Sequence, residues 1–402
     1  MTRRLYYEDS QRDRFEAVVL SARLDGPATS VVLDATAFYP GGGGQPADRG
    51  QLGDRAVLEV LAEGDVVWHR LDGAIPEGAR VEGRLDWRRR FDHMQQHTGQ
   101  HILSQAFIEV AKAETRSFHL GEEIVTIDVA HPGPDADLLR RVEDLANRVV
   151  WEDRPVITHV VPPERARDYP LRKSPDVVGD VRIVEVEKFD WSACAGTHVA
   201  RSGQVGMIAI VGTERYKGGT RVAFVCGGRA LKRLRDAGQV LRGLCLEFTS
   251  GEADLPRAVA RLKEERAKLE GRLKPLLAES LSREAESLLG RADRGASAPV
   301  VAGWFPDRDP SETAALAAQI TARGGVALLV AGKDDSGMAR AHFSAPKGTI
   351  SVGAILTDLC RAYGAKGGGR PEAAQGAIPA DRAPEAVEAA RRAALAGTSH
   401  GE

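Results

Sequence analysis

Two pairs of metal-binding side chains, each with four-residue spacing, constrain this chain more than any other sequence feature. His97 and His101 lie in a stretch with helical character, and residues four apart on a helix share a face, so both imidazoles can converge on one point. Cys194 and His198 have the same spacing and offer a thiolate and an imidazole, which suit zinc. One such pair alone would be weak evidence for a metal site, but the two together predict a tetrahedral zinc site with three nitrogen ligands and one sulfur ligand.

Length and composition indicate a globular protein of several domains. The 402 residues exceed one ordinary domain, and a hydrophobic share of 43% with a charged share of 28% is typical of soluble proteins. No apolar run approaches the length that spans a bilayer, and no apolar stretch follows the basic start of the chain, so we expect a cytoplasmic protein. The four cysteines are scattered without a disulfide framework, which fits a reducing compartment.

The first 87 residues alternate short β-type segments with turns, which predicts a small antiparallel barrel or sandwich. Four consecutive glycines directly before Gln45 stand out. Glycines in a row lose backbone entropy and pack nothing, which alone would describe a floppy loop. The flanking prolines and aromatic residues favour a shaped loop whose bare backbone approaches a ligand. The predicted substrate-binding residues are Gly42, Gly43, Gly44, Gln45 and Thr98.

Helices packed on an antiparallel sheet are expected over residues 88–244, so the fold class is α+β. The first helix should run from Arg88 to about Ala113 and carry the two histidines. Asp135 is the expected N-cap of a second helix. One strand is expected from Val181 to Phe189, just before the cysteine loop.

The pattern of hydrophobic and charged residues changes after residue 250. Residues 252–294 have heptad-like leucine spacing, which predicts a long exposed helix or a helical hairpin that Pro275 kinks or divides. Residues 298–378 have the pattern of a small α/β domain that ends in a glycine-rich motif, Gly367–Gln375. Residues 379–402 are rich in Ala, Arg and Glu, and we expect a short helix followed by a flexible tail. The leucine stripe should pack either on its own chain or on a second copy, and the second alternative gives a homodimer through the heptad segment and the C-terminal domain.

Five predicted domains follow from these patterns. They are residues 1–87 (β-barrel), 88–244 (zinc-binding domain), 252–294 (helical segment), 298–378 (α/β domain) and 379–402 (tail).

A cluster of basic residues suggests contact with nucleic acid. Residues 215–242 hold eight Lys or Arg and one acid, Asp236, which is enough for phosphate contacts if one face gathers them. An ordinary solvated helix face explains the charge equally well. Lys217 and Arg221 follow the cysteine loop along the chain, and with Arg370 of the glycine-rich motif they form the predicted RNA-binding set.

The motifs around the metal ligands carry a family resemblance. His97–His101, Cys194–His198 and Phe38–Pro40 with the glycine loop resemble the editing domain of alanyl-tRNA synthetase and its freestanding relatives, the AlaX-type editing proteins. The helical segment and Gly367–Gln375 are similar to the C-terminal DHH-associated domain of that synthetase. The resemblance is therefore to the long AlaX form, over about residues 5 to 380. Ala195, where the family often has Gly, is a departure that should only stiffen the loop.

This resemblance implies a zinc-dependent hydrolase that removes serine, and in second place glycine, from mischarged alanine-specific tRNA. Such editing has a physical reason, because a hydrophobic pocket rejects an added hydroxyl or a missing methyl only weakly. Zinc could position the amino group, polarise the ester carbonyl or bind the attacking water. Four protein ligands would leave no open position, so either one of them, such as His198, stays away from the metal and leaves room for water or substrate, or the site is chiefly structural.

Three alternative functions can be compared by whether the sequence contains the residues that each of them needs. A zinc metalloprotease needs a glutamate after the first histidine, where this chain has Thr98. A phosphodiesterase with a DHH-associated domain needs an Asp-His-His cluster, which does not occur in this sequence. The alternative that stays open is an RNA-binding protein with a structural zinc and no hydrolytic activity.

Overall fold

The structure, a computed structural model, describes residues 1–25, 28–173, 179–294, 297–332 and 336–396. It divides into two compact units, Met1–Leu244 and Cys245–Glu402. The predicted mixture of helices and β-sheets is confirmed. Within the described ranges, the helices are all too short or too polar to cross a bilayer.

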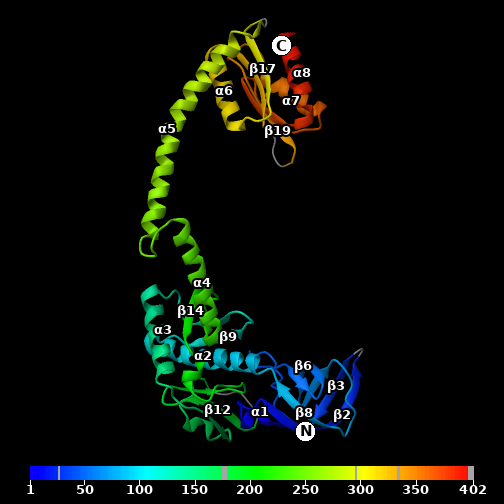
Figure 1. The fold of residues 1–402 in the computed structure, drawn as a ribbon, viewed down its shortest axis with the longest axis vertical. Helices are drawn as coiled ribbons and strands as arrows, with labels where there is room; N and C mark the ends of the chain where they lie inside the picture. Colours follow the sequence, from blue (N-terminus) through cyan, green and yellow to red (C-terminus); the bar gives the residue numbers. More distant parts are fainter. Residues whose placement is uncertain (26–27, 174–178, 295–296, 333–335, 397–402) are drawn as a thin grey trace. The chain divides into compact units, whose positions relative to one another are not determined.

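A closed antiparallel barrel occupies the start of the first unit (Figure 1). Its strands are, in spatial order, β2 (Arg14–Asp25), β3 (Ala28–Leu33), β7 (Val66–Leu71), β6 (Arg55–Glu63), β5 (Gly50–Leu52) and β8 (Arg80–Leu85). In β7 every second residue, Val67, His69 and Leu71, is buried, as expected for a strand with one face on a core. Beside the barrel lie β1 (Arg3–Arg4), α1 (Leu5–Glu8) and β4 (Ala35–Thr36), of which β1 and β4 pair in parallel.

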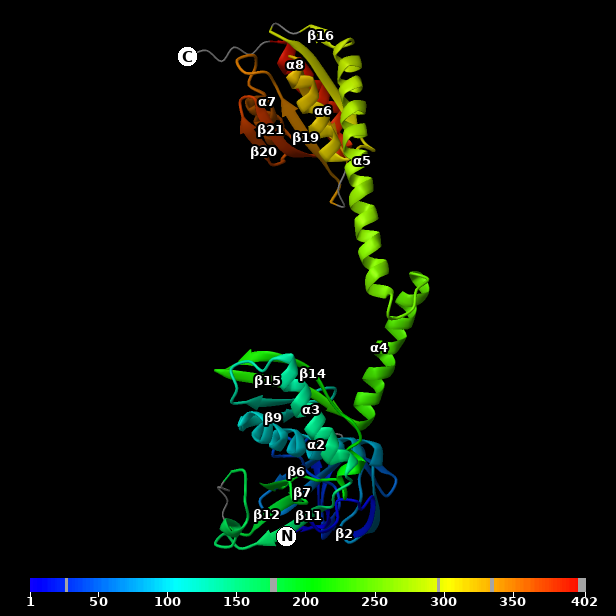
Figure 2. The ribbon, with the colours of Figure 1, turned by 90° about the vertical axis from the view of Figure 1, so that its left-hand side faces the viewer.

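Helices and two antiparallel sheets form the rest of the first unit. The four-stranded sheet has the order β14 (Ile208–Tyr216), β15 (Gly219–Cys226), β10 (Val125–Val129), β9 (Thr115–Leu120). The three-stranded sheet has the order β11 (Val156–Val161), β12 (Val181–Val186), β13 (Asp190–Ala193). The helical elements are α2 (Trp87–Ala111), α3 (Ala136–Trp151), the start of α4 (Gly227–Glu247), and the single turns η1 (Ala166–Asp168) and η2 (Ser202–Val205). Figure 2 shows α2 and α3 next to each other, and both contribute to one apolar core with the four-stranded sheet.

Side-chain caps explain where the two long helices of this unit begin. The carboxylate of Asp86 accepts a hydrogen bond from the Arg89 N–H at 3.1 Å, and α2 starts at the next residue. Asp135 caps α3, as predicted, by accepting from the Leu138 N–H at 2.8 Å. Lys112, with a φ of 52°, ends α2 in the left-handed conformation.

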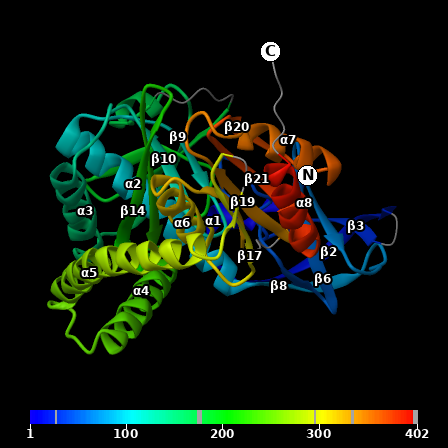
Figure 3. The same ribbon diagram turned by 90° about the horizontal axis from the view of Figure 1, so that it is seen from above.

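The second unit is a six-stranded sheet with helices on both faces (Figure 3). The sheet order is β16 (Asp293–Arg294), β17 (Pro299–Phe305), β18 (Val326–Ala331), β19 (Met338–Ser344), β21 (Ala373–Pro379), β20 (Gly367–Arg370). The helices are α5 (Leu255–Leu289), α6 (Pro310–Ala322), α7 (Val352–Ala362), α8 (Ala383–Leu395) and the turn η3 (Ala380–Arg382). Because β18 is buried on both faces, Leu329 packs towards α5 and α6 while Leu328 and Val330 pack towards α7 and α8.

Of the two alternatives predicted for residues 252–294, the long exposed helix is confirmed and the hairpin is wrong. The segment forms one helix, α5, which continues through Pro275. A proline removes one helical hydrogen bond, and 35 residues of helix retain the others on both sides. The short helix expected within residues 379–402 is confirmed as α8, but its assignment to a tail is wrong, because α8 packs its small residues Ala383, Ala386 and Ala390 into the core. Residues 397–402 of the predicted tail lie outside the described residues.

A third correction concerns the strand expected from Val181 to Phe189. The structure ends β12 at Val186, turns at Lys188, and begins β13 at Asp190. Lys188 has a φ of 54°, a left-handed conformation that reverses the chain. This turn presents Asp190, and the Cys194 loop after it, to helix α2.

Candidate metal centre

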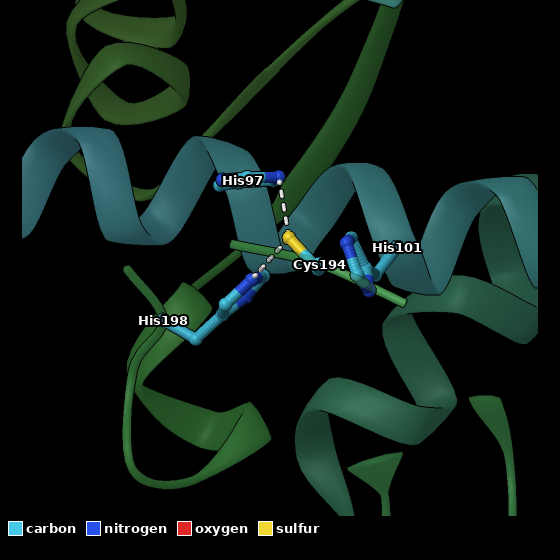
Figure 4. A group of neighbouring side chains, drawn as sticks. All are labelled: His97, His101, Cys194 and His198. Atoms are coloured by element: carbon cyan, nitrogen blue, oxygen red, sulfur yellow. Dashed lines mark hydrogen bonds between the residues drawn. The ribbon is translucent and has the colours of Figure 1, made fainter. Parts of the chain in front are cut away.

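The four predicted ligands come together in the first unit (Figure 4). His97 and His101 project from α2, and Cys194 and His198 come from the loop after β13. One ligand atom from each residue lies within 4.8 Å of the other three. The Cys194 sulfur is 3.5 Å from His97 Nε2 and 3.3 Å from His198 Nε2. A tetrahedral zinc with ordinary bond lengths separates sulfur from nitrogen ligands by about 3.5 Å, so these distances suit one ion.

The other ring nitrogen of each histidine has a hydrogen-bond acceptor. His97 Nδ1 is 2.8 Å from Gln45 Oε1, and His101 Nδ1 is 3.1 Å from Asp190 Oδ2. His198 Nδ1 is 3.0 Å from Thr98 Oγ1. These contacts leave all three Nε2 atoms for a metal, and this is the usual arrangement around ligating histidines.

The donor set therefore fits zinc. The three histidines are almost fully buried, and the inward Nε2 atoms of His97 and His198 share the sulfur of Cys194 as their partner, a convergence that one metal ion would satisfy. Burial opposes ionisation of Cys194, but the neighbouring His97 and a hydrogen bond from His101 hold the pKa of its thiol well below the ordinary value. Burial lowers the pKa of His198 to about 3, so its imidazole is neutral, the form that binds metals.

Gly196 and Gln45 shape the space between the two ligand pairs. A Cβ on Gly196 would lie 2.2 Å from His97 Cε1 and 2.8 Å from Gln45 Oε1, so only glycine fits there. Gln45 is itself fully engaged, because its Oε1 also accepts from the Thr197 N–H at 3.0 Å and its Nε2 donates to Thr197 Oγ1 at 2.7 Å. This glutamine links the glycine loop to both ligand-bearing segments.

The glycine loop has a defined shape. All four of its glycines have positive φ, and Gly42 and Gln45 exchange two backbone hydrogen bonds of 3.0 Å. The Tyr39 hydroxyl donates to the Gly42 carbonyl at 2.9 Å. At Gly44 a Cβ would approach Phe118 Cε2 to 2.8 Å, and Phe118 in turn lies against His97. Gly42, Gly43 and Gly44 are exposed beside the cluster.

Thr98, predicted to bind substrate, is completely buried. Its hydroxyl is the partner of His198 Nδ1 and also accepts from the Val199 N–H at 3.3 Å. The structure thus brings Thr98 to the cluster, where its contacts orient His198, one of the predicted ligands.

The predicted RNA-binding residues take no part in these contacts. The Arg221 guanidinium is held by both oxygens of Asp128, at 2.7 and 3.0 Å, and stacks on Tyr216. Lys217 lies in the turn between β14 and β15, with a φ of 45°. Arg370 belongs to the second unit, at the end of β20.

Sequence reasoning missed two groups that support the site. Asp190, the partner of His101, is also paired with Arg172 at 2.5 Å, and no spacing rule marks it because strand pairing brings it to α2. Arg90 and Asp48 form a completely buried ion pair that ties α2 to the end of the glycine loop. Asp48 also accepts from the Tyr39 N–H at 2.7 Å. In the sequence, the only indication of this ion pair is that Asp48 follows closely after the four glycines.

Comparisons with known proteins agree with these motifs. The DHHA1 domain model matches residues 297–395. The model of the threonyl and alanyl tRNA synthetase second additional domain matches residues 181–223, which include Cys194 and His198. The DHHA1 match reaches the end of α8, beyond the domain limit of 378 predicted from sequence.

Curated relatives match the chain along its length. The alanine-tRNA ligase of Methanoculleus marisnigri is 35% identical over 100% of this chain and 44% of its own length. That of Pyrococcus abyssi is 33% identical over 96% of this chain and 43% of its own length. The chain thus spans less than half the length of these relatives.

Among solved structures, the C-Ala domain from Aquifex aeolicus alanyl-tRNA synthetase matches 26% of this chain and 97% of that chain. It is 19% identical, and the TM-score of 0.23 is too low to establish a common fold. The two family matches and the relatives that align along nearly all of this chain fit an AlaX-like editing protein, related to the domains of alanyl-tRNA synthetase, as the sequence motifs predicted.

Proposed function

We propose that this protein is a zinc-dependent hydrolase that removes serine, and in second place glycine, from mischarged alanine-specific tRNA. The observation that carries the proposal is the cluster of three buried histidines with the partly buried Cys194, in which each imidazole already has an acceptor on Nδ1 (His97, His101, Cys194 and His198). Relatives that are alanine-tRNA ligases support alanine-specific tRNA as the substrate class.

These four residues would hold the zinc, which would supply Lewis-acid polarisation of the ester or activation of water. The residues around them have separate tasks. Gln45 orients His97, Thr98 orients His198 and Asp190 orients His101, so the inward nitrogens keep fixed positions. The exposed backbone of Gly42–Gly44 lets the aminoacyl end of the substrate come close, because no side chain intervenes.

Discrimination against alanine must come from polar contacts. A site that hydrogen-bonds a substrate hydroxyl rejects the analogue that lacks it far more strongly than an apolar pocket can. Around the cluster, the carbonyl and amide groups of the glycine loop supply such contacts. The correct alanyl ester lacks the hydroxyl that would form these hydrogen bonds, and it is therefore spared.

RNA binding involves basic residues of both units. Lys217 and Arg370 keep the role predicted for them, whereas Arg221 contributes less because Asp128 already neutralises its charge. We further propose that the protein acts in the cytoplasm and forms homodimers through the 252–294 helix and the C-terminal domain. Exposed leucines of α5, Leu262, Leu269 and Leu276, recur every seven residues and fit such an association.

A second candidate function is an RNA-binding protein with a structural zinc. The number of ligands favours it, because four protein ligands are typical of closed structural sites and catalytic sites keep one position open. This candidate predicts tRNA binding without hydrolysis.

One assay separates the two candidates. Alanine-specific tRNA is charged with serine, glycine or alanine in separate reactions, and the half-life of each ester is measured with the native protein, after chelation, and after zinc is restored. The editing enzyme should shorten the seryl half-life in a zinc-dependent manner and spare the alanyl ester. Equal half-lives with and without protein, together with retained tRNA binding, would favour the structural-zinc protein.

A further inference from the structure

We propose that a cleft between α2, α3 and the turn before β13 binds a free α-amino acid with an apolar side chain. The described residues that line this cleft enclose a volume of about 540 Å³ and include none of the four predicted metal ligands. The inference goes beyond the proposed hydrolase and does not depend on it, because binding of the amino acid is measured without hydrolysis.

Two charged side chains of opposite sign border the cleft. Glu109 projects from α2, and Lys188 occupies the turn between β12 and β13 with a φ of 54°. Both residues are exposed, and neither side chain forms an ion pair with another of the described residues. A carboxylate and an ammonium at one cleft can attract the ammonium and the carboxylate of a zwitterion.

Two neutral polar groups accompany these charges. Gln105 donates through Nε2 to Glu109 at 3.0 Å, which leaves its Oε1 atom as an acceptor. Trp191 also lines the cleft, and its indole N–H donates to no group in the part of the chain that the structure describes. The cleft thus offers one further acceptor for an ammonium group and one further donor for a carboxylate.

The rest of the lining is mostly apolar and held by packing. Leu145 of α3 and Phe189 of the turn are half-buried and pack against the core of the first unit. The guanidinium of Arg154 fixes the Phe189 ring, with Cζ 5.6 Å from the ring centre. On the other side, Trp191 packs against a separate apolar cluster under the three-stranded sheet. A wall of packed apolar side chains with a few polar groups is typical of a site for small molecules.

An α-amino acid matches these groups better than a simple ion or an apolar molecule. Its ammonium group pairs with Glu109, and its carboxylate accepts hydrogen bonds from Lys188 and Trp191. Its side chain packs on Leu145 and Phe189, which removes apolar surface from water. A simple anion would use only the donors, and an apolar molecule would use neither charge.

The cleft borders the groups that hold one predicted metal ligand. Gln105 lies one helical turn after His101 on α2, and Trp191 follows Asp190, whose Oδ2 is 3.1 Å from His101 Nδ1. Successive residues of a strand point to opposite faces, so Trp191 faces away from His101 while Asp190 faces it. The amino acid therefore binds behind the support of His101 and away from the metal.

The test measures binding of L-leucine to the zinc-loaded protein. Ligand-observed nuclear magnetic resonance gives the dissociation constant, which should be on the order of 1 mM because both charges are exposed. Glu109→Gln and Lys188→Gln should each weaken binding by about two- to fivefold. Lys112→Gln is the matched control, because Lys112 is also an exposed lysine with a left-handed φ, 52°, and does not line the cleft.

Two leucine analogues test the class of ligand. Isoamylamine lacks the carboxylate and isocaproate lacks the ammonium group, so each should bind more weakly than leucine by about the same factor as the matching variant. Leucine binding that neither Glu109→Gln nor Lys188→Gln weakens would overturn the proposal, since the leucine would then bind elsewhere, such as at the metal. A lack of saturable binding at about 50 mM leucine would also overturn it. Either result leaves the hydrolase standing, because the ester half-lives test that activity separately.

Discussion

Gln45 and His97 are 52 positions apart in the chain and are joined by a hydrogen bond of 2.8 Å between Oε1 and Nδ1. Because an amide oxygen only accepts, this contact fixes the proton of His97 on Nδ1 and turns Nε2 towards Cys194. The glycine loop and the metal ligands are therefore coupled through one side chain.

Gln45→Ala should lower zinc affinity by about 10- to 100-fold, since loss of a partner that orients a ligating histidine typically has that effect. Competition with a chromophoric chelator measures it. Gln105→Ala is the control. Gln105 is on α2, the helix that carries His97, and among the described contacts its side chain forms a hydrogen bond only with Glu109. Native zinc affinity in Gln45→Ala would show that the ligand cluster holds its geometry without the loop.

Gly196→Ala should abolish zinc binding, because the new methyl group would lie 2.2 Å from His97 Cε1 and displace the imidazole. Ala195→Gly, the neighbouring change, removes a methyl group and should keep the metal. Metal analysis of both purified proteins provides the comparison. Stoichiometric zinc in Gly196→Ala would be inconsistent with the placement of His97 described above.

Gly44→Ala should reduce deacylation more than Gly43→Ala. Both positions have positive φ, 85° and 54°, so both substitutions carry a backbone cost of about 1 kcal/mol. Only at Gly44 would the methyl group collide with Phe118, whereas nothing lies within 4 Å at Gly43. Rates measured at equal zinc content compare the two variants, and equal losses would indicate that backbone strain alone matters.

His69 makes the stability of the protein depend on pH. Burial in the barrel lowers the pKa of His69 from 6.5 to about 4, so the folded state keeps it neutral while the unfolded state takes up a proton below pH 6.5. The free energy of unfolding should therefore fall as the pH drops from 6.5 towards 4, by about 3 kcal/mol from this group. Its Nε2 is 2.8 Å from Thr36 Oγ1.

The variant His69→Gln removes the titrating group and keeps the capacity for hydrogen bonds. Urea denaturation at pH 7.0 and 4.5 should show a smaller loss of stability on acidification in this variant than in the native protein. If both proteins lose the same free energy of unfolding, His69 is already protonated in the folded state.

The shared face of His97 and His101 could be predicted from the sequence because its geometry is local. Four-residue spacing on α2 aligns His97 and His101 whatever surrounds them, and Asp135 was identifiable as a cap for the same reason. Asp190 could not be identified, because it reaches His101 only through the turn at Lys188.

Local rules also failed where packing decides the structure. Alanine-rich composition suggested a flexible tail, yet Ala383, Ala386 and Ala390 form a smooth stripe that allows α8 to pack closely on the sheet. Pro275 suggested a break in the helical segment, although one missing hydrogen bond does not end a helix as long as α5. Arg221 was predicted to be a cation available for RNA. The pairing of β10 with β15 places Asp128 beside it, and this pairing cannot be predicted from the sequence.

The most direct test of the proposed function compares two cysteine variants. Cys194→Ala removes a predicted ligand, and Cys245→Ala removes a cysteine of α4 that lies outside the cluster. The deacylation rate constant for alanine-specific tRNA charged with serine is measured for each variant in single-turnover reactions. We expect Cys194→Ala to lose about two or more orders of magnitude and Cys245→Ala to match the native protein. Full activity of Cys194→Ala would contradict a zinc-centred hydrolase.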